Sequence, residues 1–497
     1  MKALMVTLLV ILCSSCIIVC NALPLFWHGM LTGGVHGAGN NYGLLVKERW
    51  ITQRLNHFDD SNLQTWQQRY FVNDTFYKPG GPVFLMIWGE SEAYSVWIQE
   101  GMWIEWARQI GALCLMLEHR YYGMSHPTKD VSTSNLRYLS SEQALADLAY
   151  FRNYMMQNMS MKSEQKWVSF GGSYSGSLSA WFRLKYPHLV DMAVASSAPV
   201  RVQMNFTGYL EVMRDSLATS KIGETCNTNI QGAVNQMEKL LQDKAGWKTI
   251  TKAFRLCKPL QGNIENDVAN LFMSLAGNFM GVVQYNNNNK PLMVSSVSNV
   301  TIDTVCDIMG NSSYGDNMAR YAAINSLMLD SYEEKCLDIG YDDMIQEMKE
   351  TSWTSPESVW GRQWMYQKCT EFGFFHTSDS AEQPFGTRFP LSFCLQQCAD
   401  IFGKQFNYDM VAQGIEWNLL NYGGDKIKAS RVIFPNGSID PWHVRGILHD
   451  LSTDQLAVFI NGTAHCADMD PPAASDPPQL VEARQTIFFI METWLKE

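Results

Sequence analysis

The stretch 167–187, which reads WVSFGGSYSGSLSAWFRLKYP, constrains the fold of this chain more than any other. It opens with an apolar run at 167–170 that is long enough for a buried strand, and apolar residues recur at helical spacing from Leu178 onward. Between them lie two glycines followed by Ser173. Strand, glycine-rich turn, serine and helix form the layout of a nucleophile elbow, whose serine hydroxyl projects above the sheet. Ser173 is therefore a candidate nucleophile.

Ser173 needs partners, because short Gly/Ser motifs also form ordinary turns and Ser175 stands where the G-x-S-x-G motif has glycine. Asp440 follows the apolar run 431–434, and His465 follows the run 456–460. The order serine, aspartate, histidine is the α/β-hydrolase order. His465 would accept the serine proton, and Asp440 would fix the imidazole tautomer and stabilise the imidazolium. Three other side chains remain rival candidates in the sequence, namely His119, His443 and Asp468.

Strand-like and helix-like segments alternate on both sides of the elbow. Apolar runs at 82–88, 112–117 and 192–197 have the length of buried strands. The segment 94–109 has helical spacing, and a second helix is opened by a capping box of Ser140 and Gln143. The segment 48–71 has the pattern of early antiparallel strands. The alternation predicts an α/β fold with a parallel sheet covered on both faces.

The region 200–422 departs from this alternation. It contains helical stretches rich in Met and Leu and most of the cysteines of the chain. We interpret it as a large, mostly helical, disulfide-braced cap inserted into an α/β-hydrolase domain. The predicted organisation is a signal peptide at 1–22, a first hydrolase part at 23–199, the cap at 200–422 and a second hydrolase part at 423–497.

The first 22 residues have the features of a secretory signal, with Lys2 at the start, an apolar run at 3–20 and small residues before position 23. An uncleaved membrane anchor is the alternative. No other stretch is long and apolar enough to span a bilayer, so we expect no stable membrane insertion after cleavage. We expect a secreted protein or one of the endosomal or lysosomal lumen. The net charge of −11 argues against nucleic acid and anionic membranes as partners.

Cysteine usage agrees with export. Three of the twelve cysteines lie in the signal, and Cys114 lies in an apolar run, where we expect a free buried thiol. The other eight could form four disulfides. The sequence has neither an H-E-x-x-H motif nor a zinc-ribbon spacing, so it predicts no cofactor and no metal site. Seven sequons predict glycosylation, and they begin at Asn73, Asn158, Asn205, Asn299, Asn311, Asn436 and Asn461.

At these residues the chain resembles the serine peptidase family of lysosomal Pro-X carboxypeptidase, dipeptidyl peptidase II and thymus-specific serine protease. In the cap the matches look most like those of thymus-specific serine protease. The matching stretches are QRLNHF (53–58), QRYFVN (68–73), EHRYYGMS (118–125), LRYLSSEQALADL (136–148), FGGSYSGSLSAWFRLKYPHL (170–189), ASSAPV (195–200), YQKCTEFGFF (366–375), NGSIDPW (436–442) and AHCADM (464–469). The resemblance implies a Ser173–Asp440–His465 triad in a hydrolase with a helical cap. The chain departs from the family's exopeptidases at Ser175, where they carry glycine, and at Cys466, where they carry a second histidine.

The predicted reaction is acyl transfer to water, with Ser173 attacking a peptide carbonyl. The Tyr174 N–H would form half of the oxyanion hole, and the loop after Trp88, near Gly89 or Glu90, would supply the other half. The resemblance implies an exopeptidase on proline-containing peptides, of the carboxypeptidase or the dipeptidyl-peptidase type. Glu90 or Glu92 could pair a free α-amino group. An esterase or lipase, a catalytically silent secreted binding protein and a homodimer remain open alternatives.

Overall fold

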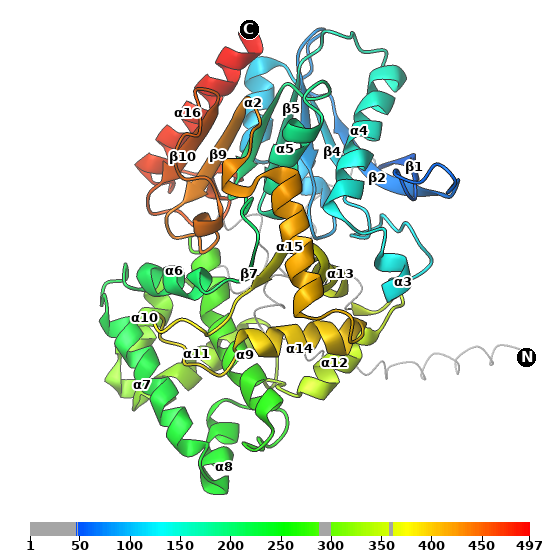
Figure 1. Ribbon diagram of the computed structural model, residues 1–497. Coiled ribbons are helices and arrows are strands. Elements are labelled where there is room, and N and C mark those ends of the chain that lie inside the picture. Colours follow the sequence, from blue (N-terminus) through cyan, green and yellow to red (C-terminus); the bar gives the residue numbers. More distant parts are fainter. Residues whose placement is uncertain (1–45, 47, 288–299, 357–360) are drawn as a thin grey trace, which may run out of the picture.

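The computed structural model describes residues 46, 48–287, 300–356 and 361–497. The predicted signal peptide and the sequon at Asn299 lie outside these residues. The chain forms an upper lobe built on a twisted sheet and a lower lobe of helices (Figure 1). Among the described residues, no helix combines the length and the apolar character needed to cross a bilayer.

The upper lobe contains an eight-stranded mixed sheet with the strand order β1-β2-β4-β3-β5-β6-β9-β10. Two strands at one edge, β1 (Arg49–Arg54) and β2 (Thr65–Asn73), are antiparallel to each other, and β2 is antiparallel to β4. All later strands are parallel, which confirms the predicted alternation. These parallel strands are β3 (Val83–Ile87), β4 (Leu113–Leu117), β5 (Trp167–Gly172), β6 (Met192–Ser196), β9 (Val432–Gly437) and β10 (Gln455–Ile460).

Helices cover both faces of this sheet (Figure 1). On one face α2 (Met102–Ile110) and α16 (Pro478–Lys496) pack in an apolar cluster with alternate residues of the strands. On the other face α4 (Ser141–Asn158) and α5 (Tyr174–Lys185) pack in a second, larger cluster. Strands β3, β4 and β6 are buried along their whole length, which explains why they read as continuous apolar runs.

Two local predictions need correction. The segment 94–109 is a short 3-10 helix, η2 (Ser95–Ile98), followed by α2, because Gly101 between them has φ +106° and cannot continue a helix. The Ser140 hydroxyl does cap α4 by accepting the Gln143 N–H. The reciprocal half of the predicted capping box is replaced, since the Gln143 side chain bonds the loop at Asn56 and His57 instead.

The lower lobe is formed by the chain between β6 and β9. Its helices pack around α9 (Glu265–Gln284), which is buried over most of its length. A small parallel pair, β7 (Gln203–Asn205) and β8 (Gly373–Phe375), joins the start of the insertion to the segment before α14. The other elements are α6 (Gly208–Leu217), α7 (Thr225–Leu240), α8 (Lys244–Ala253), α10 (Ile302–Gly310), η4 (Ser312–Tyr314), α11 (Asn317–Ser331), α12 (Tyr341–Lys349), α13 (Gly361–Gln367), the π-helix η6 (Lys368–Phe372), α14 (Leu391–Phe402), α15 (Tyr408–Tyr422) and η7 (Gly424–Lys426). In the hydrolase part of the chain α3 (Thr133–Leu136), η8 (His443–Arg445) and η9 (Ala467–Met469) complete the fold.

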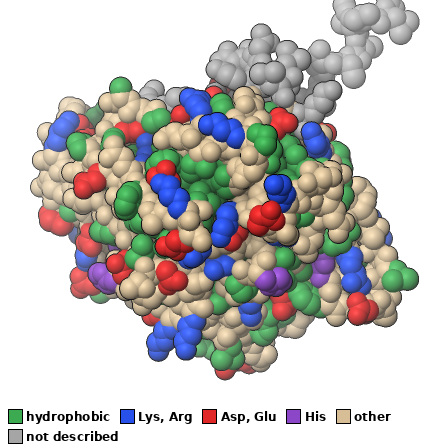
Figure 2. Space-filling view, turned by 90° about the horizontal axis from the view of Figure 1, so that it is seen from above, with side chains coloured by type: hydrophobic (Ala, Val, Ile, Leu, Met, Phe, Trp, Pro, Cys, Tyr) green, Lys and Arg blue, Asp and Glu red, His purple; other side chains and the backbone are tan. Residues whose placement is uncertain are grey.

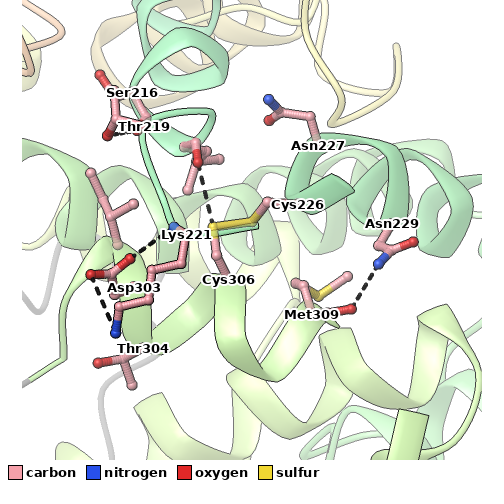
Figure 3. The surroundings of a disulfide bond; sticks show 12 residues. Ser216, Thr219, Lys221, Cys226, Asn227, Asn229, Asp303, Thr304, Cys306 and Met309 are labelled. Atoms are coloured by element: carbon pink, nitrogen blue, oxygen red, sulfur yellow. Dashed lines mark hydrogen bonds and ion pairs between the residues drawn. A yellow bond between two sulfur atoms is a disulfide. The ribbon is translucent and has the colours of Figure 1, made fainter. Parts of the chain in front are cut away.

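Three disulfides brace the helical lobe, and they pair Cys226 with Cys306, Cys257 with Cys336 and Cys369 with Cys398. The first joins α7 to α10, where Asn229 also donates to the Met309 carbonyl (Figure 3). The expected fourth bridge is absent from the described residues, because Cys394 is a buried free thiol within the lobe and Cys466 is a free thiol in the hydrolase part. Cys114 is free and buried, as predicted.

A buried ion pair ties the first motifs of the chain together. Arg120 donates from Nε and Nη2 to the two Asp147 oxygens at 2.6 and 2.7 Å, and both side chains are at most 1% exposed. His57 Nε2 lies 2.7 Å from the same carboxylate. Burial alone would raise the pKa of Asp147, but the Arg120 guanidinium and His57 hold that pKa below its usual range. The motifs around His57 and Arg120 are therefore structural.

Candidate active site

Ser173 lies in the turn between β5 and α5, in the strained conformation of a nucleophile elbow. Its φ is +60° and its ψ is −130°, a region that residues with a side chain rarely adopt. The turn is tight, because a Cβ on Gly171 would lie 2.1 Å from the Ser175 carbonyl oxygen and one on Gly176 would lie 2.7 Å from the Ser196 oxygen. These contacts explain why the sequence has glycine on both sides of Ser173.

Ser175, which replaces the usual glycine, has a local role in the same turn. Its hydroxyl donates to the Gly172 carbonyl at 2.8 Å, and its oxygen lies 3.1 Å from the Gly172 N–H. The side chain thereby bonds both backbone groups of the residue before Ser173. The departure from the G-x-S-x-G pattern closes the turn and does not disrupt it.

Asp440 and His465 form a buried pair at the carboxyl ends of β9 and β10. The distance from Asp440 Oδ2 to His465 Nδ1 is 2.9 Å, and the two side chains are 0% and 4% exposed. Burial alone would lower the pKa of His465, but the Asp440 carboxylate and a hydrogen bond with the Cys466 thiol together raise it well above its usual value. Asp440 thus stabilises the protonated imidazole, which is the effect expected of the aspartate in the predicted triad.

The loop after β6 brings the elbow and the histidine together. The Ser173 N–H donates to the Ser196 carbonyl at 2.9 Å, and the Cys466 N–H donates to the Ser197 hydroxyl at 2.9 Å. The two segments are in contact, because a Cβ added to Gly172 would lie 2.8 Å from Cys466 Sγ. Gly172 directly precedes Ser173, and Cys466 directly follows His465. Ser196 and Ser197, which are consecutive, therefore hold the Ser173 turn and the His465 loop side by side.

The rival candidates have other partners. His443 Nδ1 lies 2.8 Å from the Asp440 backbone carbonyl and not from its carboxylate. His119 is buried against the Tyr174 hydroxyl at 3.0 Å, and burial lowers the pKa of His119 to about 4. Asp468 accepts the Ser196 hydroxyl at 2.5 Å. All three therefore support the site without pairing with its histidine.

The predicted oxyanion-hole residues lie at the start of α5, for Tyr174, and in the loop after β3, for Gly89 and Glu90. Tyr174 is the first residue of this helix, where backbone N–H groups have no partner within the helix. Its hydroxyl is anchored from two sides, by His119 and by the Gln367 amide at 3.1 Å. The loop after β3 touches the same turn, since a Cβ on Gly89 would lie 3.5 Å from the Ser175 nitrogen.

The two glutamates of that loop differ in their partners. Glu92 pairs with Arg69 at 3.0 Å, so its charge is already compensated. Glu90 forms no ion pair with any other described residue, and its charged neighbour at the site is His465. Burial raises the pKa of Glu90 to about 7, partly opposed by its own backbone N–H and by His465. A carboxyl group that could receive a cation is therefore located beside the histidine.

The other end of the sheet carries a different feature. A hollow of about 530 Å³ lies there, lined by Pro82, Lys166 and the end of α16 around Phe488 and Leu495. Figure 2 views the molecule from that side and shows hydrophobic side chains gathered between charged ones. Because Pro82 and Lys166 precede β3 and β5, this hollow is at the amino ends of the strands, opposite to Ser173. Within the described ranges, no three His, Cys, Asp or Glu side chains are grouped so as to hold a metal ion.

Comparison with known proteins agrees with this arrangement. The family model for serine carboxypeptidase S28 matches residues 53–487, most of the chain. The chain belongs to the serine carboxypeptidase S28 family. This S28 protein is 35% identical over 463 residues to human thymus-specific serine protease, covering 92% of this chain and 88% of the relative. It is 30% identical over 460 residues to bovine lysosomal Pro-X carboxypeptidase, covering 90% and 88%.

Family membership makes the protein a serine-type peptidase. Sequence reasoning did not find two residues of this S28 peptidase that connect its helical lobe to the starts of α4 and α5. Gln367 bonds Tyr174, and Glu371 accepts the Ser141 backbone N–H at 2.9 Å and its hydroxyl at 2.7 Å. Both stand in YQKCTEFGFF, so the resemblance marked the stretch but gave no role for either side chain.

Proposed function

We propose that this protein is a secreted or lysosomal serine exopeptidase in which Ser173, Asp440 and His465 form the catalytic triad. The buried Asp440–His465 pair beside the Ser173 elbow is the observation that carries the proposal. His465 takes the Ser173 proton as the hydroxyl attacks the peptide carbonyl, and later gives it to the leaving amine. The Tyr174 N–H and an N–H of the Gly89–Glu90 turn stabilise the oxyanion. Water then releases the acyl group from Ser173.

The family relationship supports peptides that contain proline as substrates, since one relative is named a Pro-X carboxypeptidase. Glu90 favours recognition of the free amino end, because an ionised carboxylate beside His465 would pair with a substrate ammonium group. Since the pKa of Glu90 is about 7, its charge and this attraction increase as the pH rises through 7. The proposal is therefore a dipeptidyl-peptidase that selects the α-amino group through Glu90.

Export is supported by the three disulfides, which persist in oxidising compartments. Three of the predicted glycosylation sites are exposed, namely Asn158, Asn311 and Asn461. Asn205 is half-buried and donates to Asp379. Asn73 and Asn436 are at most 8% exposed and donate to the Ile98 and Ile447 carbonyls, so we expect no glycan at these two.

The first experiment is labelling with a fluorophosphonate probe at pH 5 and pH 7, with Ser173→Ala as the matched variant. We expect label on the wild type and none on Ser173→Ala. A folded wild type that takes no label at either pH contradicts the triad and leaves a catalytically silent binding protein. Faster turnover of a simple ester than of any prolyl peptide would favour an esterase instead.

The second experiment compares two prolyl peptides that differ only in a free or an acetylated amino end. We expect cleavage of the free peptide, with kcat/KM increasing from pH 6 to about pH 7 in the wild type and less in Glu90→Gln, because the substrate amino group itself loses its proton at about pH 8. Equal cleavage of both peptides, or release of the carboxyl-terminal residue from the acetylated one, would exclude the role of Glu90.

A further inference from the structure

The last residue of the cap helix α9, Gln284, contacts both catalytic loops. Its backbone carbonyl accepts the His465 N–H at 3.0 Å. Its side-chain oxygen accepts the indole N–H of Trp442 at 3.0 Å. Trp442 follows Asp440 by two residues, and the Trp442 backbone N–H donates to Asp440 Oδ1 at 2.9 Å. One cap residue is thus bonded to the histidine loop and to the aspartate loop at the same time.

These contacts close a ring. It runs from Gln284 to His465, across the 2.9 Å pair to Asp440, along the loop to Trp442 and back to the Gln284 amide. All four side chains are at most 5% exposed, so water does not compete for these bonds. The Gln284 amide group is itself fixed, because its oxygen also accepts the Tyr209 hydroxyl at 2.7 Å and its nitrogen donates to the Tyr285 hydroxyl at 2.9 Å.

The ring joins two loops whose relative position sets the alignment of Asp440 with His465. Asp440 and His465 lie on separate loops after β9 and β10, and a hydrogen bond between two loops is only as well aligned as the loops are held. The sheet fixes the strands, and the two loops are bonded to each other where the Ile439 N–H donates to the Thr463 carbonyl at 2.9 Å. The cap adds a second tie, which reaches His465 and Trp442 themselves. A displacement of about 1 Å of a reacting group can lower a rate about 100-fold.

We propose that Gln284 is a positioning residue, through which the cap holds Asp440 and His465 in catalytic alignment. The inference rests on the proposed triad, and it makes the end of α9 a part of the catalytic structure. The cap of this peptidase would then be required for the chemical step, and substrate contacts that move α9 would change kcat.

The test compares variants that each remove hydrogen bonds to the same amide group. Gln284→Leu removes the amide, and Trp442→Phe removes the indole N–H, so both open the ring. Tyr209→Phe removes one bond to the same oxygen but leaves the ring closed and the amide held by the Tyr285 hydroxyl, which makes it the matched control. Asn270→Leu removes a buried amide of the same helix, bonded to the Ile339 carbonyl, and controls for loss of stability.

We expect Gln284→Leu to lower kcat about 100-fold with little change in KM, and Trp442→Phe to lower it in the same direction. Tyr209→Phe and Asn270→Leu should keep kcat within about threefold of the wild type, whatever their melting temperatures. The double variant of Gln284 and Trp442 should lose little more than Gln284→Leu alone, because both changes open one ring. Equal losses of kcat in Gln284→Leu and Asn270→Leu would overturn the proposal.

A spectroscopic readout separates this inference from the proposed function. The proton between His465 Nδ1 and Asp440 should give a low-field proton NMR signal in the wild type and in Tyr209→Phe. The signal should shift or vanish in Gln284→Leu. A signal that is unchanged in Gln284→Leu refutes the role of Gln284 even if the wild type hydrolyses no peptide. A wild type that takes no fluorophosphonate label, with the expected change in the NMR signal, refutes the function alone.

Discussion

Glu371 offers a sharp test of how buried charge sets the stability of this protein. Its carboxyl is 5% exposed, on the π-helix η6, and it accepts hydrogen bonds from Ser141 and Gln367. Burial raises the pKa of Glu371 from 4.5 to about 7, and the hydrogen bonds from Ser141 and Gln367 oppose only part of this rise. At about 1.4 kcal/mol per pKa unit, the difference amounts to about 3 kcal/mol.

The sign of the effect follows from the two pKa values. Below pH 4.5 Glu371 is protonated in the folded and the unfolded chain, so it adds no pH dependence. Between pH 4.5 and 7 the unfolded chain loses this proton while the folded protein keeps it, so the free energy of unfolding decreases as the pH rises. Above pH 7 both states are ionised, and the full penalty of about 3 kcal/mol remains.

The Glu371→Gln variant lacks this titration, so its stability relative to the wild type should improve by about 3 kcal/mol between pH 4.5 and pH 7.5. Urea unfolding followed by tryptophan fluorescence, in steps of one pH unit, measures the difference. Glu350→Gln, an exposed site on the same lobe, controls for the loss of one carboxylate. If the stability difference between wild type and Glu371→Gln stays constant to within about 0.5 kcal/mol, Glu371 does not titrate in this range and the reasoning is wrong.

Three further outcomes are expected. Asp147→Asn leaves the buried Arg120 guanidinium without its counter-charge and should cost about 3–5 kcal/mol in urea unfolding, whereas a loss below about 1 kcal/mol contradicts the buried pair. Gly171→Ala forces a Cβ against the Ser175 carbonyl and should lower fluorophosphonate labelling about 100-fold, while Gly281→Ala, which meets nothing within 4 Å, should label like the wild type. Thiol titration of the denatured, non-reduced protein without its signal should find three free thiols, and any other number refutes the three-disulfide pattern.

The sheet could be predicted from the sequence because its strands are buried on both faces. Such strands appear as short continuous apolar runs, and the runs predicted at 82–88, 112–117 and 192–197 correspond to β3, β4 and β6. The aspartate and the histidine were selected by chain order and by their place after a strand. The structure places these two side chains 2.9 Å apart, although 25 residues separate them in the sequence.

The features that could not be predicted from the sequence depend on contacts between residues that are far apart in the chain. Glu371 bonds Ser141 across 230 residues, and Trp442 bonds Gln284 across 158. No spacing rule connects such positions, and a glutamine at the end of an apolar helix resembles any polar cap residue. The fourth disulfide was expected from an even count of cysteines, but pairing requires two sulfurs in contact, and Cys394 and Cys466 are in different lobes.

The place of the insertion explains how a large helical lobe can contact the proposed catalytic site without disturbing the sheet. The lobe leaves the sheet after β6 and returns at β9, and these two strands are neighbours, with Ala193 paired to Val432. The insertion therefore begins and ends close together, and the sheet closes behind it as it would around a short loop. Ser173 precedes the lobe in the sequence, while Asp440 and His465 follow it.

Because the lobe starts and ends beside the loops of the proposed triad, its own residues fall within hydrogen-bonding distance of them. Gln367 reaches Tyr174 on the side of the elbow, and Gln284 reaches Trp442 and His465 on the other side. A lobe that only covered the substrate would need neither contact. A change in the cap that alters substrate selection should therefore also alter kcat whenever it shifts α9 or η6, and substitutions on α8, which lies at the far end of the lobe, should leave kcat unchanged (Figure 1).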